Sequence, residues 1–404
     1  MIFDSESVFE DNVITVLKQH GWKDGVLRYP TEQDLLDNWK GILYRNNNDI
    51  DRLGKYPLTD GEMAQIIEQI ETLRTPLALN SFVNGRTVSI TRDNKEDVAH
   101  FGKEISLYIY DRKEIAGGKS TYQIAQQPVY PAKNKMLNSR RGDLVLLING
   151  MPLIHIELKK SGIPVSQATN QIEKYTHEGV FTGLFRLVQI FVAMNPDDAV
   201  YFANPGVDKF NPSYYFHWAD YNNEPICGGQ NPGKDEWKLF IGGTSGTAGL
   251  LSIPMAHQLI GFYTIADSAD GCLKVLRSYQ YIAANAISDV VRKCDWEQRP
   301  TTPGRPGGYV WHTTGSGKTM TSFKSAQLIA DSHDADKVVF LMDRIELGTQ
   351  SLKEYRSFAD SETEVQGTEN TGVLRDKLNS TNVNDTLIVT SIQKMSNVKA
   401  GEIG

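Results

Sequence analysis

The sequence has few of the features that mark secreted, membrane-spanning or metal-cluster proteins. Its 404 residues contain three cysteines, Cys227, Cys272 and Cys294, whose spacing does not resemble a metal site and whose low number fits a reducing cytosol. No apolar run approaches the length of a membrane span, and the N-terminus lacks the basic and apolar regions of a signal peptide. The net charge of −7 argues against indiscriminate nucleic-acid binding but leaves room for a local basic groove. We therefore expect a cytoplasmic protein, long enough for two to three domains.

A glycine-rich loop at residues 315–319 carries the clearest chemistry. It follows the apolar run 309–311, expected to be a strand, and precedes a segment with helical character. Backbone N–H groups in such a turn, with the N-terminus of the next helix, surround the β- and γ-phosphates of a nucleotide. Lys318 adds a positive charge, and the hydroxyl of Thr319 is placed to ligate Mg²⁺. The alternative is a glycine-rich turn that carries a lysine by chance, but the strand–loop–helix context favours NTP binding.

The loop departs from the strict pattern G-x-x-x-x-G-K-[ST], because His312 replaces the first glycine. The form at 312–319 instead resembles motif I of superfamily 2 helicases and translocases. Residues 337–344, followed by Glu346, Leu347 and Gln350, resemble motif Ia of that family, and 386–394 is similar to its next DNA-contacting motif. Residues 276–280 resemble the adenine-reading Q motif. The ATP-binding residues implied are Gln280, Thr314, Gly315, Ser316, Gly317, Lys318 and Thr319.

The acidic box that follows these motifs in helicases has no counterpart in the sequence. That box supplies the Asp and Glu that hold Mg²⁺ and orient the attacking water. We therefore expect this chain to bind ATP weakly and not to hydrolyse it alone. We also expect the chain to be truncated within this lobe, either as a piece of a longer protein or as a naturally incomplete gene product.

Residues 141–160 predict a β-hairpin. Two apolar runs flank Asn149-Gly150, the strongest short-range hairpin signal. Pro152 removes one ladder donor, so we expect a bulge near it. A simple two-residue turn would place Asp143 opposite Ile156, whereas one extra residue places Asp143 opposite Glu157. We predict the second register.

An Asp beside a Glu needs a divalent cation to stay ionised, and the hard oxygen ligands favour Mg²⁺. Glu157 and Lys159 share one face of the strand with His155 beside them, and Lys159 is placed to hold a water or to neutralise developing charge. The pattern Asp143…Glu157-Leu158-Lys159 resembles the D…ExK motif of PD-(D/E)XK nucleases, with Gly142 in place of the usual proline. Basic residues flank this pattern and form a candidate DNA groove: Lys133, Lys135, Arg140, Arg141, Lys159 and Lys160.

Two further patterns accompany the hairpin. Gln171 and Tyr175 lie at i, i+4 on an expected helix and resemble the QxxxY accessory motif of type I restriction endonuclease motor subunits, which supports cleavage. Near the N-terminus Glu6 and Glu10 fall on a helical stripe, and the nuclease family places an acid on its first helix near the metal. Glu10 is the first choice and Glu6 the second; an acidic residue that complements the helix dipole is the alternative for both.

The order of these motifs resembles the N-terminal part of the restriction (motor) subunit of a type I restriction–modification enzyme, over nearly the whole chain. The resemblance implies an α/β protein: a PD-(D/E)XK-like mixed sheet with flanking helices, then an incomplete RecA-like parallel-sheet domain. We expect a nuclease domain at 1–245, a connecting segment at 246–270 and the first RecA-like lobe at 271–404. The glycine-rich stretch 242–249 is the clearest linker.

The function expected from this resemblance is Mg²⁺-dependent cleavage of double-stranded DNA, coupled to ATP-driven translocation. It implies methyltransferase (modification) and specificity subunits as partners, which fits a chain without a base-reading motif. Two alternatives stay open at this point. One is a stand-alone helicase–nuclease of DNA repair. The other is a non-catalytic assembly module with a structural hairpin and a nucleotide-sensing loop.

Overall fold

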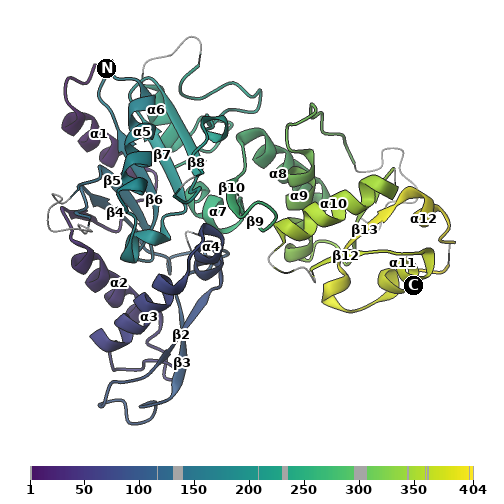
Figure 1. The fold of residues 1–404 in the computed structure, drawn as a ribbon, viewed down its shortest axis with the longest axis horizontal. Helices are drawn as coiled ribbons and strands as arrows, with labels where there is room; N and C mark the ends of the chain where they lie inside the picture. Colours follow the sequence, from purple (N-terminus) through teal and green to yellow (C-terminus); the bar gives the residue numbers. More distant parts are fainter. Residues whose placement is uncertain are drawn as a thin grey trace. The chain divides into compact units, whose positions relative to one another are not determined.

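The computed structural model describes residues 2–115, 117–130, 140–207, 209–229, 235–294, 307–343, 345–359, 361, 364–399 and 401–403. They form two compact units, which are treated separately below. The first comprises Met1–Ile265 and Gly271–Ser278, and the second comprises Ala266–Asp270 and Tyr279–Gly404. Both units combine helices with sheets, as the expected α/β class requires (Figure 1). Across these described ranges, no helix is both long and apolar enough to cross a membrane.

The first unit is built on a six-stranded mixed sheet in the order β1-β4-β5-β6-β7-β8. Its strands are β1 (Val26–Arg28), β4 (Tyr122–Gln126), β5 (Leu144–Ile148), β6 (Met151–Leu158), β7 (Ile190–Met194) and β8 (Ala199–Ala203). The pairs β1–β4 and β6–β7 are parallel, and the other neighbours are antiparallel. Every residue of β5 and β6 is buried, so these central strands are continuous apolar runs rather than alternating ones.

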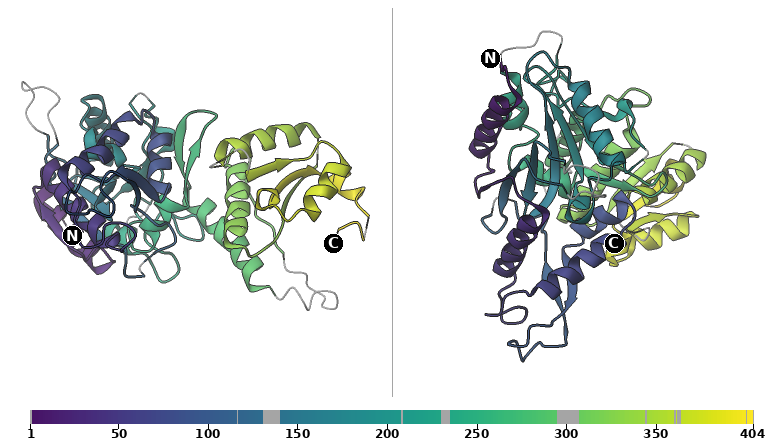
Figure 2. Two further views of the ribbon diagram at one scale, coloured as in Figure 1. Left: turned by 90° about the horizontal axis from the view of Figure 1, so that it is seen from below. Right: turned by 60° about the vertical axis from the view of Figure 1, so that its left-hand side comes forward.

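Helices cover both faces of this sheet (Figure 2). The helices of the first unit are α1 (Glu6–Gln19), α2 (Glu32–Asn46), α3 (Asp60–Thr72), α4 (Pro76–Asn84), α5 (Val165–His177), α6 (Glu236–Gly242) and α7 (Met255–Gly261). Ile172 of α5 packs on Phe191 and Phe202 of β7 and β8. On the other side Phe9 of α1 stacks edge-on against Trp237 of α6, at 5.2 Å between ring centres. Buried apolar contacts therefore fix α5 and α1 in place beside the hairpin.

A separate antiparallel ribbon of the first unit consists of β2 (Thr87–Thr91) and β3 (Glu104–Tyr108). Arg92, directly after β2, is fully buried between Glu62 of α3 and Asp97, at 2.6 and 2.9 Å. Glu62 also caps α3 through a capping box with Thr59. This ion cluster joins the ribbon to α3 and has no part in the sites described below.

The second unit contains the parallel sheet β11-β13-β12, from β11 (Val338–Met342), β12 (Val365–Gly367) and β13 (Leu387–Ser391). Its helices are α8 (Ser278–Lys293), α9 (Lys318–Ser332), α10 (Ile345–Phe358), α11 (Thr371–Asn379) and α12 (Ile392–Ser396). Leu387 and Val389 of β13 pack with α9 and α10, whereas Ile388 packs with α11. Alternation along β13 therefore buries both faces of the sheet, as a parallel sheet requires.

Most of the expected connecting segment 246–270 belongs to the first unit, and Ala266–Asp270 belongs to the second. The glycine-rich stretch 242–249 closes a tight turn, with Gly243 bridged to Ala248. Beyond it, the indole of Trp22 donates to the carbonyl of Leu251 at 2.6 Å, and α7 is buried. The units divide instead near Ile265–Tyr279, where β9 (Thr264–Asp267) and β10 (Cys272–Val275) pair with each other. Burial of the apolar residues after this stretch holds the backbone in place, although its glycines suggested a flexible linker.

The strand expected at 309–311 is absent: these residues have no regular secondary structure. Tyr309 and Trp311 are 90% and 88% exposed. Three apolar residues after Gly307-Gly308 gain too little burial to offset the entropy of ordering this backbone. The segments after the loop form as predicted: α9 begins at Lys318, and β11 and β13 fall within 337–344 and 386–394.

Candidate functional site

The β5–β6 hairpin brings Asp143 and Glu157 together. Asn149 and Gly150 have φ values of +53° and +84°, as a type I′ turn requires. The ladder pairs Leu147 with Pro152 but Leu146 with Ile154, so Leu153 is an extra, bulged residue. Leu144 therefore pairs with Ile156, and the next position along the ladder sets Asp143 opposite Glu157. The predicted register is confirmed.

The carboxyl group of Glu157 is buried, and Asp143 beside it is partly buried. Asp143 accepts a hydrogen bond from the backbone N–H of Leu158 at 2.6 Å, and the side chain of Glu157 is fully buried. Burial raises the pKa of Glu157 to about 7, against the lowering effect of Lys159. Burial, then the charge of Glu157, raises the pKa of Asp143 well above its usual range. At neutral pH the pair therefore retains a proton unless a cation compensates the second negative charge.

Three observations show that the pair suits a hard cation. Oε2 of Glu157 is buried without a hydrogen-bond partner among the described residues. The nearby His155, with Nε2 at 3.4 Å from that oxygen, cannot supply the charge, because burial lowers its pKa to about 4. Within the described ranges no three His, Cys, Asp or Glu side chains form a metal-binding group, so the donors at this position are the two carboxylates. Carboxylate oxygens are hard ligands and fit a hard divalent cation.

Lys159 and Glu6 lie on one side of the carboxylate pair. Nζ of Lys159 is 3.4 Å from Oε1 of Glu157 and donates to the carbonyl of Leu158 at 2.8 Å. Nζ also lies 3.8 Å from a carboxylate oxygen of Glu6, whose side chain is about half exposed, at 47%. Lys159 is thus held close to the carboxylate pair by contacts with Glu157 and Leu158 at the end of β6 and with Glu6 of α1.

Glu10 is linked to the pair through Gln127. It is 3% exposed, and its carboxylate accepts hydrogen bonds from the amides of Gln126, at 2.6 Å, and Gln127, at 3.2 Å. Burial raises the pKa of Glu10, whose charge in turn contributes to the raised pKa of Asp143. The backbone N–H of Gln127 donates to the carbonyl of Asp143 at 2.7 Å. Both candidate acids of α1 therefore lie beside the site, and Glu10 is the buried one.

Gln171 and Tyr175 are on α5, as predicted, and contact each other. The amide of Gln171 donates to the hydroxyl of Tyr175 at 2.7 Å, and this hydroxyl donates to the backbone carbonyl of Arg141 at 2.9 Å. Tyr175 is buried, and the nearby charges of Glu157 and Asp143 contribute to its raised pKa. The two side chains thus hold the backbone that leads into Asp143.

The glycine-rich loop of the second unit has the geometry of an anion cradle. Gly315 and Gly317 have φ values of +80° and +82°, and α9 begins at Lys318 without a side-chain cap, which leaves its first N–H groups for a ligand. Lys318 is exposed, and its Nζ donates to the carbonyl of Thr313 at 3.3 Å. The hydroxyl of Ser316 donates to the same carbonyl at 2.7 Å.

The helix α8 supports this loop. The amide of Gln280 donates to the carbonyl of Gly317 at 3.3 Å, and the hydroxyl of Tyr279 donates to the carbonyl of Ser316 at 2.8 Å. The ring of His312 lies edge-on to that of Tyr279, at 5.5 Å. The segment that resembles the Q motif is therefore beside the loop, although Gln280 and Gly317 are 37 positions apart in the sequence.

Replacing Gly317 by alanine is expected to weaken ATP binding about tenfold. The new Cβ would lie 2.5 Å from the amide nitrogen of Gln280, on a backbone whose φ of +82° already disfavours it. Calorimetric titration of ATP into the chain measures the change. Gly401→Ala is the matched control, because it has a φ of +91° with no atom within 4 Å of the added Cβ. Wild-type affinity in Gly317→Ala would contradict the expected crowding.

The other helicase-like segments meet at the carboxyl ends of β11 and β13. The amide of Gln393 donates to the carbonyl of Asp343 at 3.0 Å, and Lys394 donates to the carbonyl of Thr368. Gln350 contacts Glu354 within α10 at 3.0 Å. Arg344 and the side chains of Glu346 and Leu347 lie outside the described residues.

Comparison with protein families gives two matches that divide the chain. The sequence model for the N terminus of type I restriction enzyme R proteins matches residues 4–210, and that for SWI2/SNF2 ATPases matches residues 279–403. The first match covers more than half of the chain. This chain belongs to the type I restriction enzyme R protein family.

Relatives of this R protein chain are named as endonuclease subunits of type I restriction enzymes. One from Staphylococcus saprophyticus is 32% identical over 404 residues, which cover 98% of this chain and 37% of the relative. One from Staphylococcus aureus is 33% identical over 403 residues, 99% of this chain and 38% of the relative. The EcoprrI subunit of Escherichia coli is 26% identical over 343 residues, 77% of this chain and 99% of the relative. The chain thus spans less than two-fifths of the staphylococcal relatives.

The basic run of this R protein chain does not form a continuous groove in the described residues. Lys133 and Lys135 lie outside them. Arg140 is paired with Glu178 through two contacts of 2.9 Å, and Lys159 is buried against Glu157. The exposed cations that remain are Arg141 and Lys160. Glu178, distant in sequence, neutralises Arg140, which the sequence could not show.

Several residues of the site had no role in the sequence-based prediction. Gln126 and Gln127 bind Glu10, and the hydroxyl of Tyr130 lies 2.9 Å from Nδ1 of His155. The side-chain amides of these two consecutive glutamines, at the end of a buried strand, could have indicated a nearby polar residue, since buried amides need hydrogen-bond partners. Tyr130 belongs to no recognisable pattern, and only the fold brings it to His155.

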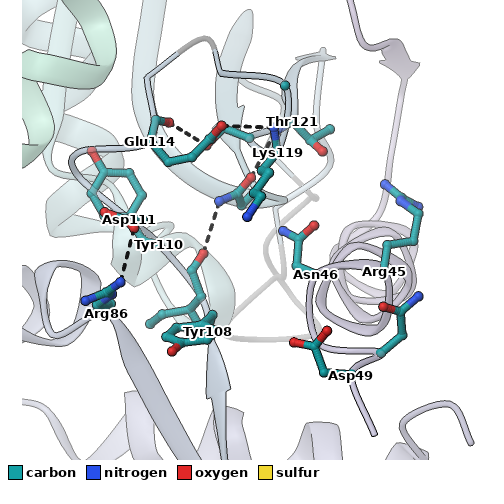
Figure 3. A pocket seen from close by; sticks show the side chains of 15 residues that line it. Arg45, Asn46, Asp49, Arg86, Tyr108, Tyr110, Asp111, Glu114, Lys119 and Thr121 are labelled. Carbon is teal, nitrogen blue, oxygen red and sulfur yellow. Dashed lines mark hydrogen bonds and ion pairs between the residues drawn. The ribbon is translucent and has the colours of Figure 1, made fainter. Parts of the chain in front are cut away.

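The first unit also contains a pocket of about 650 Å³ (Figure 3). Three cations and three carboxylates line it, together with polar side chains: Arg45, Arg86, Lys119, Asp49, Asp111 and Glu114. None of the predicted site residues lines this pocket, and Arg86 is paired with Asp111 at 3.4 Å. Its balanced charge favours no ligand class, so the carboxylate pair and the glycine-rich loop stay the candidate sites of this R protein chain.

Proposed function

We propose that this chain is the nuclease and first motor part of an ATP-dependent DNA endonuclease subunit of a type I restriction enzyme. The observation that carries the proposal is the bulged hairpin, which brings Asp143, Glu157 and Lys159 together within the segment that matches the R protein family. A phosphate-binding loop in the segment that matches SWI2/SNF2 ATPases accompanies it. The names of the relatives favour this function over a repair helicase–nuclease or a non-catalytic module.

In this proposal the first unit has a PD-(D/E)XK-like fold and the second is a RecA-like lobe. Asp143 and Glu157 would hold Mg²⁺, with Glu10 as the neighbouring acid. Bound there, Mg²⁺ lowers the pKa of a water and offsets charge on the phosphate. Lys159, 3.4 Å from Glu157, would orient the water or neutralise the developing charge. Gln171 and Tyr175 support the reaction by fixing the backbone before Asp143.

The loop of the second unit would bind ATP. Lys318 and the N–H groups at the start of α9 would face the phosphates, and Thr319 would ligate the accompanying Mg²⁺. Thr314, Gly315, Ser316 and Gly317 would shape the turn, and Gln280 would support it and read the adenine. We further propose that the complete subunit translocates double-stranded DNA while bound to modification and specificity subunits in the cytoplasm.

Replacing Lys159 by alanine is expected to slow DNA cleavage about a hundredfold with ATP hydrolysis intact, because the ammonium contributes charge at one site only. The measurement uses the complete subunit assembled with its partners on unmethylated circular DNA. Lys40→Ala is the control, since Lys40 of α2 forms a surface pair with Asp60 of α3. Cleavage by Lys159→Ala at the wild-type rate would remove Lys159 from the mechanism and undermine the nuclease proposal.

A further inference from the structure

Tyr29, directly after β1, has an exposed ring on an unusual backbone. Its φ is +54°, in the left-handed region that bulky residues rarely adopt. Its N–H donates to the carbonyl of Gln126 at 2.8 Å, so the backbone is held against β4. The residue is nevertheless 51% exposed, and its ring gains little burial in return. Backbone strain without a packing benefit is characteristic of functional positions.

The strained backbone lies at the edge of the carboxylate site. Arg28 pairs with Gln126 in the parallel β1–β4 ladder, so Tyr29 and Gln127 leave the two strands side by side. Gln127 also has a positive φ, +47°. Its side chain binds Glu10, and its N–H donates to the carbonyl of Asp143. The same distortion thus positions a buried acid of the site and an exposed aromatic ring next to it.

Arg141 completes this edge. It is exposed and stands two residues before Asp143, and its backbone carbonyl accepts the hydrogen bond from Tyr175. Its guanidinium lies over the ring of Tyr29, 5.8 Å from the ring centre. Arg140 beside it is neutralised by Glu178. Arg141 is therefore an exposed cation beside the carboxylates.

We propose that Tyr29 and Arg141 form the edge by which the carboxylate site holds double-stranded DNA. The guanidinium of Arg141 binds a backbone phosphate next to the one that is cleaved, and the ring of Tyr29 packs against the adjoining sugar. Acidic side chains repel DNA, so the site needs a cation at its edge to retain the substrate. This inference rests on the proposed nuclease function and adds the residues that hold its substrate.

The test compares Tyr29→Asn, Tyr29→Phe and Arg141→Gln in the assembled enzyme, with circular DNA and ATP. Asparagine tolerates a positive φ, so Tyr29→Asn removes the ring without disturbing the backbone. Tyr29→Asn and Arg141→Gln are each expected to raise the KM for DNA about tenfold. Arg141→Gln also lowers the slope of log affinity against log salt by about one, whereas Tyr29→Asn leaves that slope unchanged. Tyr29→Phe, which keeps the ring, raises the KM less than twofold.

Tyr221→Asn is the matched control, because Tyr221 is 78% exposed on the turn closed by Asp220 and Glu224. Its KM is expected to equal that of the wild type. A wild-type KM in both Tyr29→Asn and Arg141→Gln overturns the inference, as does a fall in kcat with KM unchanged. Lys159→Ala, run in parallel, separates the two proposals. If Lys159→Ala loses DNA cleavage while Tyr29→Asn and Arg141→Gln keep the wild-type KM, the proposed nuclease function stands and the inference about the edge is wrong.

Discussion

Glu157→Gln is expected to slow DNA cleavage by the assembled enzyme about a thousandfold, or about 4 kcal/mol of activation free energy. The substitution keeps the shape of a fully buried side chain and removes one of the two charges that would hold Mg²⁺. It also resembles the protonated state that the raised pKa already favours, so the fold should tolerate it. Plasmid cleavage under saturating Mg²⁺ and ATP measures the loss, and ATP hydrolysis is expected to continue.

The same substitution should change how stability depends on pH without metal. The pKa of Glu157 rises from 4.5 to about 7 on folding, so the folded state binds this proton more tightly. The resulting stabilisation is fully present below about pH 4.5 and is lost as the pH rises through about 7, on the order of 3 kcal/mol. Urea unfolding in a chelator between pH 5 and 8 detects it. Mg²⁺ should restore stability at pH 8 in the wild type but not in Glu157→Gln.

An unchanged cleavage rate in Glu157→Gln would contradict the assignment of the carboxylate pair. So would equal stabilisation of both proteins by Mg²⁺ at pH 8. Glu178→Gln is the matched control, since Glu178 pairs with Arg140 at 2.9 Å and approaches neither Asp143 nor Glu157 in any described contact. It should keep the wild-type response to Mg²⁺.

Lys318→Ala should lower ATP hydrolysis by the assembled enzyme about a thousandfold and abolish the cleavage that depends on it. Lys318 is exposed and contacts only a loop carbonyl, that of Thr313, among its described hydrogen bonds, so the loss should not come from unfolding. Phosphate release during DNA-stimulated turnover is the measurement. The metal-free pH profile of the first unit should stay as in the wild type, because Glu157 is untouched.

Lys353→Ala, an exposed lysine on α10, is the control for loss of a surface charge from the same unit. It is expected to hydrolyse ATP at the wild-type rate. If Lys318→Ala also hydrolysed ATP at the wild-type rate, the loop would not be the site that binds the phosphates. Lys318→Ala and Lys159→Ala thus form a pair of variants. Lys318→Ala disables the proposed ATP site, and Lys159→Ala disables the proposed nuclease site.

Local rules predicted the arrangement of the hairpin well. Asn149-Gly150 specifies the turn, and Pro152 cannot donate to the ladder, so a bulge beside it follows from the chemistry of two residues. The helix after the glycine-rich loop and the pair Gln171–Tyr175 also follow from short-range spacing. These features are set within a few residues of sequence, where propensity and periodicity are informative.

Features that depend on distant partners were not predictable. Glycines at 242–249 indicated a linker, but burial of Leu250, Leu251 and the following helix holds that segment in the first unit. The apolar run 309–311 indicated a strand, but no described strand pairs with it. The pairing of Arg140 with Glu178 spans 38 residues. Composition along the chain does not encode such contacts, because tertiary packing decides them.

Because of the bulge at Leu153, the number of residues between Asp143 and Glu157 decides whether their side chains lie on the same face of the sheet. One residue more or fewer between Asp143 and Glu157 would turn one of the two side chains to the opposite face of the sheet, whatever residues filled the hairpin. Sequence drift within β5 and β6 is therefore tolerable as long as it preserves apolar bulk, whereas a single insertion or deletion is not. In related proteins, the number of residues between the two acids should therefore change far more slowly than the identity of those residues.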